Sequence, residues 1–213
     1  DRSHASVYTK PEVVDFILDL TGYKPTKPLH EHRILEPSFG GGDFLLPIID
    51  RLLESTRQHG VQPTLGILRS SLRGVELHRE TYLDTRRRVY ERLKRDVSAE
   101  SAEKLSEEWL IQGDFLLEPF NEGFDFVVGN PPYVRQELVS APLLSEYKAR
   151  YSTLYDRADL YIPFIERSLS LLNSTGVLGF ICSDRWMKNR YGGPLRSFVS
   201  RDFHLDRKST RLN

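Results

Sequence analysis

Short apolar runs alternate along the chain with longer segments of helical periodicity, and this alternation constrains the fold more than any other feature. Several of the apolar runs are followed directly by Asp, Asn or Pro, residues that end strands. Strands that alternate with helices form a parallel sheet, because each helix crosses over to start the next strand. The sequence therefore predicts an α/β fold with a doubly wound, mostly parallel sheet and helices on both of its faces.

The predicted elements cover most of the chain. Strands are expected at Arg33–Glu36, Gly74–Leu77, Leu110–Gly113, Phe124–Gly129 and Val177–Cys182, with a weaker sixth at Phe203–Asp206. Helices are expected at Pro11–Leu20, Gly42–Leu53, Glu80–Arg95, Leu160–Leu172 and Pro194–Val199. Residues 54–73 are expected to form an extended surface loop, and residues 96–108 a polar insertion.

Length and composition are those of one globular domain. The chain has 213 residues, 39% of them hydrophobic, and none of the loops between predicted elements is long enough to link two domains. We therefore expect a single domain over residues 1–206. The polar end, residues 207–213, has no apolar periodicity and is expected to be disordered or foreign to the fold.

Charge and cysteine content exclude several classes of protein. Lys plus Arg and Asp plus Glu each total 30, so no overall basic field indicates a nucleic-acid partner. The single cysteine, Cys182, excludes an internal disulfide framework and is expected to be a small apolar strand residue. No apolar run approaches the roughly 20 residues that cross a bilayer, and the first residues lack the apolar core of a signal peptide. We expect a cytoplasmic protein without membrane contact.

A glycine-rich loop follows the first predicted strand. Gly40 and Gly42 allow the backbone to turn sharply and to approach a ligand that a Cβ would hold away. The same glycines could equally form a simple turn with no ligand.

Acidic residues end the second and third predicted strands. Glu76 would lie at the carboxyl edge of the sheet, where open α/β folds bind ligands and where a carboxylate can accept both hydroxyls of a ribose. Asp114 can accept from an adenine amino group, and Phe115 offers a ring to cover the base. Alternatively, Glu76 is a solvated acid at the end of a strand.

The fourth predicted strand runs directly into Asn130-Pro131-Pro132-Tyr133. Proline lacks a backbone donor, and Pro131 biases Asn130 toward an extended conformation. The segment therefore presents two acceptors, the Asn130 side-chain oxygen and the Pro131 carbonyl. Two acceptors can hold a planar amino group so that its nitrogen lone pair becomes available for attack, and Tyr133 offers a stacking surface for the ring that carries the amine.

Taken in order, these motifs resemble those of the class I S-adenosylmethionine-dependent amino-methyltransferases, most closely the gamma-type DNA adenine-N6 methylases of restriction-modification systems. The resemblance runs from Tyr8 to about Asp206, with the cofactor motifs first and Asn-Pro-Pro-Tyr second. Residues 8–14 are similar to the family's N-terminal cofactor motif, 159–164 to a later cofactor motif, and 176–193 to the fifth strand and the loop after it.

The resemblance implies a function and a set of site residues. It implies that the protein transfers a methyl group from S-adenosylmethionine to N6 of a flipped adenine in double-stranded DNA. The catalytic domain would span residues 1–206, and the protein would act within a restriction-modification or related defence system. Catalysis would fall to Asn130, Pro131, Pro132 and Tyr133. Cofactor binding would fall to Tyr8, Thr9, Glu36, Pro37, Gly40, Gly42, Glu76, Leu77, Asp114, Phe115, Asn130 and Phe164.

The chain also departs from the family pattern. It stops before the motif that supplies the second aromatic clamp on the base and before the domain that reads the DNA sequence, so the fragment could be inactive alone. Trp186 and Tyr191 are candidate substitutes for that clamp, and packing is an equal alternative for each. The basic stretch from Arg185 to Arg201 could supply only phosphate contacts, with a solvated helix face as its default interpretation.

Rival functions follow from the same residues. The Asn-Pro-Pro-Tyr motif indicates methylation of an amino nitrogen but does not indicate which polymer carries it, so a protein glutamine or an RNA base is an alternative substrate. The N-terminal motif and a long loop at 134–156 favour DNA. A non-catalytic module that binds cofactor or DNA within a larger assembly is the alternative from another class. His30 and His32 have no acid cluster at ligand spacing, so no metal site is expected.

Overall fold

The computed structural model describes residues 8–205, so the expectations for Asp206 and for 207–213 lie outside the described residues. These residues divide into two compact units. Residues 8–130 and 171–180 form the first, called the sheet unit, and residues 131–170 and 181–205 form the second, called the second unit.

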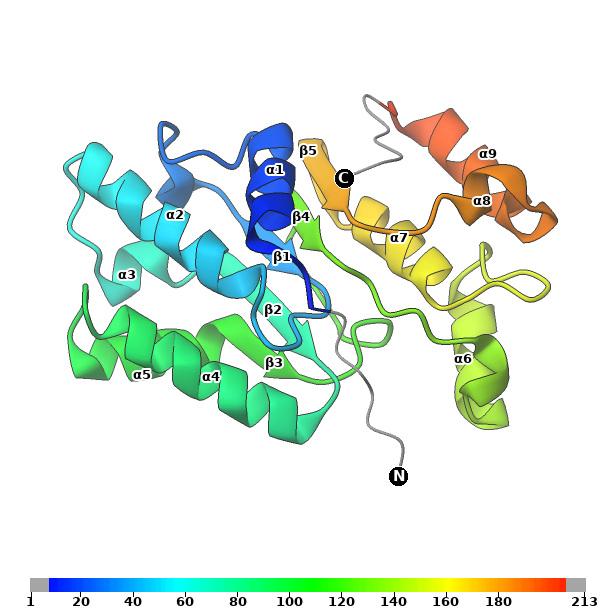
Figure 1. The fold of residues 1–213 in the computed structure, drawn as a ribbon, viewed down its shortest axis with the longest axis horizontal. Coiled ribbons are helices and arrows are strands. Elements are labelled where there is room, and N and C mark those ends of the chain that lie inside the picture. The colour runs from blue at the N-terminus through cyan, green and yellow to red at the C-terminus, as the bar shows by residue number, and fades with distance from the viewer. Residues whose placement is uncertain (1–7, 206–213) are drawn as a thin grey trace. The chain divides into compact units, whose positions relative to one another are not determined.

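The sheet unit contains a five-stranded parallel sheet, which confirms the predicted α/β fold (Figure 1). Its strands are β1 (Ile34–Glu36), β2 (Leu72–Glu76), β3 (Leu110–Gln112), β4 (Phe124–Gly129) and β5 (Leu172–Phe180). The strand order is β3-β2-β1-β4-β5, so β1 lies in the middle and its neighbour β4 comes last but one in the chain. Ile34 pairs with Leu72 on one side and with Phe126 on the other.

Five α-helices and a short 3₁₀ helix accompany this sheet within the described part of the unit. They are α1 (Pro11–Thr21), η1 (Leu29–Glu31), α2 (Leu45–Gln58), α3 (Leu65–Leu68), α4 (Arg79–Leu93) and α5 (Ala99–Trp109). Pro11 starts α1 at a position that needs no N–H donor, and Gly22 ends it in a left-handed conformation with φ 79°. Helix α2 buries Leu45, Ile48, Leu52 and their neighbours at helical spacing, and this apolar stripe forms part of the core.

The segment 54–73, predicted to be an extended surface loop, contains regular structure, so that prediction is wrong, and the polar segment 96–108 is mostly helical. Within residues 54–73, α2 continues to Gln58, α3 occupies four residues and β2 begins at Leu72. Residues 96–108 fall mostly in α5, whose N-cap Ser98 accepts a hydrogen bond from the Ser101 amide at 3.2 Å. The polar side of α5 is its exposed face, whereas Trp109 at its end is fully buried and donates from Nε1 to the Leu68 carbonyl at 3.0 Å.

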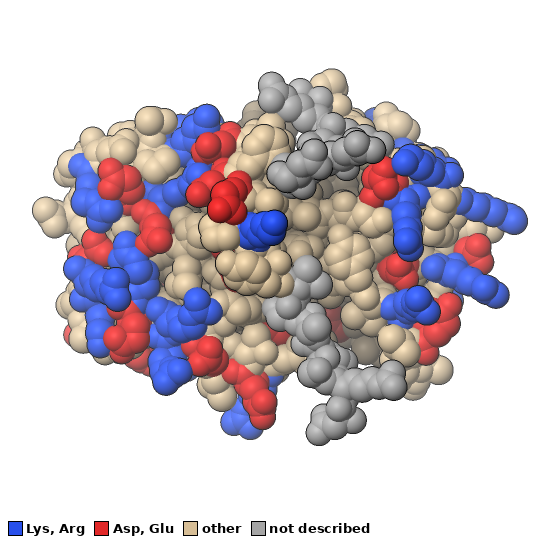
Figure 2. All heavy atoms as spheres, in the orientation of Figure 1, with Lys and Arg blue, Asp and Glu red and all other residues tan. Residues whose placement is uncertain are grey.

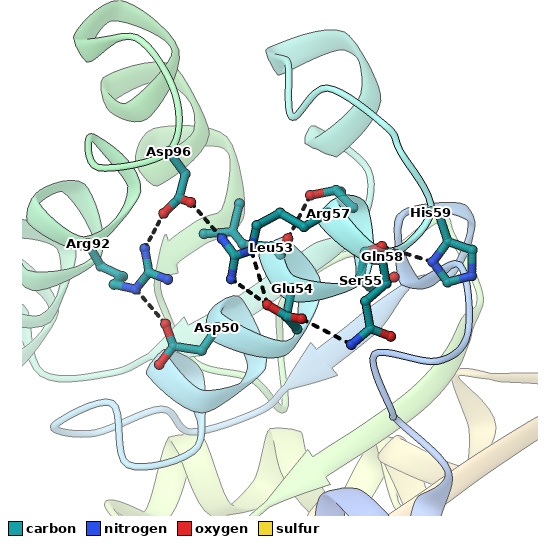
Figure 3. Close-up of polar contacts among 10 residues, drawn as sticks. Asp50, Leu53, Glu54, Ser55, Arg57, Gln58, His59, Arg92 and Asp96 are labelled. Carbon is teal, nitrogen blue, oxygen red and sulfur yellow. Dashed lines mark hydrogen bonds and ion pairs between the residues drawn. The ribbon is translucent and has the colours of Figure 1, made fainter.

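Ion pairs join α2 to α4 and to the turn after it (Figure 3). Asp96 accepts from Arg57 of α2 at 2.8 Å and also pairs with Arg92 of α4, which in turn contacts Asp50 of α2. Basic and acidic side chains are likewise interleaved over these helices in Figure 2, as the balanced charge of the chain leads one to expect.

The second unit is helical where it has regular structure. It contains η2 (Gln136–Leu138), α6 (Ala141–Arg150), α7 (Tyr161–Ser170), α8 (Arg185–Lys188), η3 (Arg190–Gly192) and α9 (Gly193–Asp202). The segment 134–156, predicted to be a long loop, thus carries η2 and α6. A carboxylate organises part of it, because Glu166 of α7 accepts from the Thr153 amide at 3.0 Å and from the Thr153 hydroxyl at 2.6 Å.

Two further expectations at the end of the chain are wrong. Residues 203–205 form no strand, since α9 ends at Asp202 and irregular backbone follows. Strand β5 ends at Phe180, so Cys182 is a partly buried loop residue whose burial raises its pKa to about 11.

Over the described residues, no helix combines the length and apolar character that a membrane span requires.

Candidate functional site

The carboxyl ends of the parallel strands bring predicted site residues to one edge of the sheet. Glu36 ends β1, Glu76 ends β2, Asp114 follows β3 by two residues, and Asn130 directly follows β4. Parallel strands all end at the same edge of the sheet, so their common direction gathers these polar side chains there.

The glycine loop after β1 adopts the sharp turn that its sequence predicts. Gly40 has φ 49° and Gly42 has φ 87°, in the left-handed region that residues with a Cβ rarely occupy. The Gly40 amide donates to Glu76 Oε2 at 3.0 Å, and the Phe39 amide donates to the Val75 carbonyl at 3.0 Å. The loop is therefore tied to the end of β2.

Glu76 is buried and has both carboxylate oxygens oriented by backbone amides. Besides the Gly40 amide on Oε2, the His78 amide donates to Oε1 at 2.8 Å. Each oxygen keeps a further lone pair, because an ionised carboxylate has about four acceptor positions. Leu77, predicted to contact the cofactor adenine, is 55% exposed at this edge of the sheet.

Glu36 is an uncompensated buried acid. Its side chain is 2% exposed, and Oε2 has no hydrogen-bond partner among the described residues. Burial raises the pKa of Glu36 well above its usual range, and the charges of Asp43 and Glu76 raise it further. The site thus gathers three acidic side chains, one of them buried and with an unpartnered oxygen, at the end of β1.

Asn130 and the N-terminal motif meet within the sheet unit. Asn130 Nδ2 lies 3.4 Å from Thr9 Oγ1, and the Thr9 amide donates to Asp43 Oδ2 at 2.7 Å. Thr9 therefore links the strand-end asparagine to the glycine loop across 121 residues of sequence. Asn130 Oδ1 is buried and has no partner among the described residues, whereas Tyr8 is 69% exposed.

Asp114 and Phe115 follow β3, as predicted, with different surroundings. Asp114 Oδ1 accepts from the Leu116 amide at 2.9 Å, so its side chain stabilises its own turn. Phe115 is 2% exposed, with its ring 6.3 Å from that of Phe120.

Three tyrosines of the second unit form a contact chain. The Tyr133 ring lies 5.6 Å from the Tyr161 ring, and the Tyr161 hydroxyl lies 3.2 Å from the Tyr191 hydroxyl. Tyr133 is 45% exposed and donates to the Ile181 carbonyl at 3.5 Å; partial burial raises its pKa to about 12. It is a neutral phenol with ring surface left for stacking. Pro131 and Pro132 precede it at the start of this unit, and Phe164 is buried on α7.

The two candidate substitutes for the second clamp have packing contacts. The Tyr191 hydroxyl forms a hydrogen bond with the Tyr161 hydroxyl. Trp186 is only 7% exposed, and its backbone lies so close to Gly192 that a Cβ at Gly192 would clash with it. Trp186 O also accepts from Arg196 at 2.6 Å. These contacts favour the packing alternative for both rings.

Sequence reasoning missed three residues that support the site, one that anchors Thr9 and two that hold the glycine loop. Asp43 anchors Thr9, Thr85 donates to the Gly40 carbonyl at 2.7 Å, and Arg88 contacts the Gly41 carbonyl. Asp43 directly follows the glycines and could have been suspected from its position. Thr85 and Arg88 lie in a polar helix with no motif. The described residues contain no cluster of three or more side chains suited to a metal ion.

Known methyltransferases are similar to this chain in sequence and in fold. Type II methyltransferase M.PaeR7I of Pseudomonas aeruginosa is 60% identical over 206 residues, which are 96% of this chain and 36% of that protein. Type II methyltransferase M.XhoI of Xanthomonas vasicola is 53% identical over 204 residues, 94% of this chain and 37% of that protein. A Listeria monocytogenes protein, provisionally assigned as a class I S-adenosylmethionine-dependent methyltransferase, superposes with a TM-score of 0.57 at 15% identity and covers 89% of this chain and 50% of its own.

The fold is that of the Rossmann-like class I S-adenosylmethionine-dependent methyltransferases. Within that class, the chain belongs to the Eco57I restriction-modification methylase family, which it matches over residues 53–208. It spans little more than a third of the length of these two relatives.

Proposed function

We propose that the protein transfers a methyl group from S-adenosylmethionine to the N6 amino group of adenine in DNA, as the modification activity of a restriction-modification system. The observation that carries the proposal is the buried Asn130 Oδ1, an acceptor without a partner among the described residues at the end of a hydrophobic strand. Membership of a restriction-modification methylase family supports DNA as the methylated polymer over RNA or a protein glutamine.

The sheet edge fits S-adenosylmethionine. This cofactor carries a positive sulfonium and an amino group, and the cluster of Glu36, Asp43 and Glu76 would stabilise such charge. Oε2 of Glu36 has no partner among the described residues and could accept a hydrogen bond from the amino group of the cofactor. The two oxygens of Glu76 are oriented by backbone amides and keep acceptor positions for the ribose hydroxyls. The residues proposed to hold the cofactor are Tyr8, Thr9, Glu36, Pro37, Gly40, Gly42, Glu76, Leu77, Asp114, Phe115 and Phe164. When bound, S-adenosylmethionine supplies an electrophilic methyl group.

The chain itself supplies acceptors, orientation and a stacking surface. Asn130 Oδ1 and the Pro131 carbonyl would accept the two amino hydrogens and stabilise the positive charge that develops on nitrogen. Positioning accounts for most of the catalysis, and no strong base is required before a proton leaves to solvent. A base that lies inside a duplex must first be flipped out, which costs a few kcal/mol that stacking on Tyr133 would partly offset.

The test is transfer of labelled methyl from S-adenosylmethionine to unmethylated DNA by the longest available form of the protein. Digestion to nucleosides should place the label in N6-methyladenine. Asn130→Ala should reduce transfer at least 100-fold, the scale seen when one donor of an oxyanion hole is lost, and should leave cofactor affinity within about threefold. Asn173→Ala is the matched control, because Asn173 lies at the start of β5 and bonds Asp125 Oδ1 at the start of β4.

Three outcomes would count against the proposal. Label in cytosine would overturn the adenine assignment. Equal transfer to RNA or protein would overturn DNA, and full activity of Asn130→Ala would overturn the role of the asparagine.

A further inference from the structure

The backbone of Gly40 is held on both sides of its Cα by side chains from distant elements. Its amide donates to Glu76 Oε2 at 3.0 Å, and its carbonyl accepts from Thr85 Oγ1 at 2.7 Å. Glu76 ends β2 and Thr85 lies in the second turn of α4, so two successive elements hold the two peptide units that flank Gly40. Fixing one group of each peptide unit fixes the φ and ψ of Gly40 and so the direction in which the loop amides point.

Thr85 uses its hydroxyl in an unusual way for a helical threonine. Such hydroxyls commonly bond a carbonyl three or four residues earlier in the same helix, as Thr56 does with Leu53 at 2.8 Å and Thr21 with Ile17 at 3.0 Å. The Thr85 hydroxyl instead reaches a carbonyl 45 residues away. Threonine is also a weaker helix former than alanine, so the helix alone does not favour it at this position.

The methyl group of Thr85 constrains the same loop. Thr85 is fully buried, and a Cβ added at Gly42 would lie 3.2 Å from its Cγ2. One side chain thus bonds the first glycine of the loop and packs against the third. Arg88, one turn further along α4, contacts the Gly41 carbonyl between them.

We propose that Thr85 is a positioning residue for the cofactor: its hydroxyl holds the Gly40 carbonyl so that the glycine loop and Glu76 are preformed to receive S-adenosylmethionine. The inference rests on the proposed function, because it assigns a role toward the same ligand. Thr85 acts through the loop and is not itself a ligand contact. Without the bond the peptide unit between Gly40 and Gly41 can rotate, and part of the binding free energy is then used to order the loop.

The experiment measures S-adenosylmethionine affinity by calorimetry for four substitutions. Thr85→Val keeps the shape and removes the hydroxyl, Thr85→Ser keeps the hydroxyl and removes the methyl, and Thr85→Ala removes both. Thr56→Val is the matched control, a buried threonine whose hydroxyl bond lies within α2.

We expect Thr85→Val and Thr85→Ala to bind about tenfold more weakly, a change of about 1.4 kcal/mol, and Thr85→Ser and Thr56→Val to bind within about twofold of the unchanged protein. Amide hydrogen exchange without ligand should show faster exchange at Gly40 in Thr85→Val but not in Thr56→Val, because the loop is then no longer preformed. If Thr85→Val does not fold, the difference in S-adenosylmethionine affinity between Thr85→Ser and Thr85→Ala still gives the contribution of the hydroxyl.

The outcomes separate the inference from the function. If the unchanged protein does not bind S-adenosylmethionine, the cofactor assignment itself fails. If it binds, and Thr85→Ala binds as tightly as Thr85→Ser, the positioning role is overturned while the proposed function stands. Equal weakening in Thr56→Val would show a general loss of stability and would also overturn the role.

Discussion

Replacing Gly42 with alanine separates the two reasons why the loop after β1 needs glycine. Gly42 has φ 87°, so alanine there would be strained by its backbone conformation alone. The new Cβ would also lie 3.2 Å from Thr85 Cγ2, so this neighbour would have to move by a few tenths of an ångström. Two other glycines of the sheet unit offer controls, because Gly60 shares the positive φ but not the crowding and Gly66 has neither.

The magnitudes follow from these geometries. Gly60 has φ 67° with nothing near an added Cβ, so Gly60→Ala should lower the free energy of unfolding by about 1 kcal/mol from the backbone alone. Gly66 lies in α3 with open space around it, and Gly66→Ala should be neutral or stabilising by up to about 1 kcal/mol. Gly42→Ala combines strain with crowding, and we expect a loss of about 2 kcal/mol.

Thermal unfolding without ligand measures the series. For a chain of this length 1 kcal/mol corresponds to about 2–4 °C, so Tm should fall by roughly 4–8 °C for Gly42→Ala and 2–4 °C for Gly60→Ala, with no fall for Gly66→Ala. If Gly42→Ala melts no lower than Gly60→Ala, the contact with Thr85 adds nothing and the argument from crowding is refuted.

Two further predictions concern charge. Burial and two neighbouring acids raise the pKa of Glu36, so its contribution to folding is fully present below about pH 4.5 and is lost as pH rises through the raised value. Glu36→Gln should therefore gain Tm over the unchanged ligand-free protein, and the gain should grow as pH rises above about 4.5; a difference that does not change with pH would contradict this. Asp96→Asn removes the shared partner of Arg57 and Arg92, which are partly exposed, so the loss should be about 1 kcal/mol or less and should shrink in 1 M salt. A loss that did not respond to salt would point to packing instead.

The strands were predictable because their patterns are local. Buried parallel strands read as short apolar runs, and Phe124–Gly129 is reproduced to the residue. The last turn of α2 (residues 54–58) and helix α5 (residues 99–109) were not predicted from the sequence, because a helix that packs on one side only is mostly polar. Trp109 was the available signal for α5, since a tryptophan that ends a charged segment needs a core to enter.

The site was predictable where chemistry and strand ends coincide. Glu36, Glu76, Asp114 and Asn130 follow strands, so a parallel sheet gathers them without knowledge of any side-chain contact. Thr85 could not be found in this way, because its importance depends on the distance between α4 and a loop 45 residues earlier. The sequence contains no pattern that reports that distance.

The position of β1 has a consequence for synthesis of the chain. It lies between β2 and β4, and Arg33, the residue just before it, donates from its amide to Asp125 Oδ2 of β4 across 92 residues. At ribosomal rates of about 5–20 residues per second, one side of the central strand stays unpaired for roughly 5–20 s after it is made. During that interval Ile34 and Leu35 expose an apolar edge on which non-native strands can pair, so the nascent chain should be most prone to aggregation, and most dependent on chaperones, before residue 124 emerges.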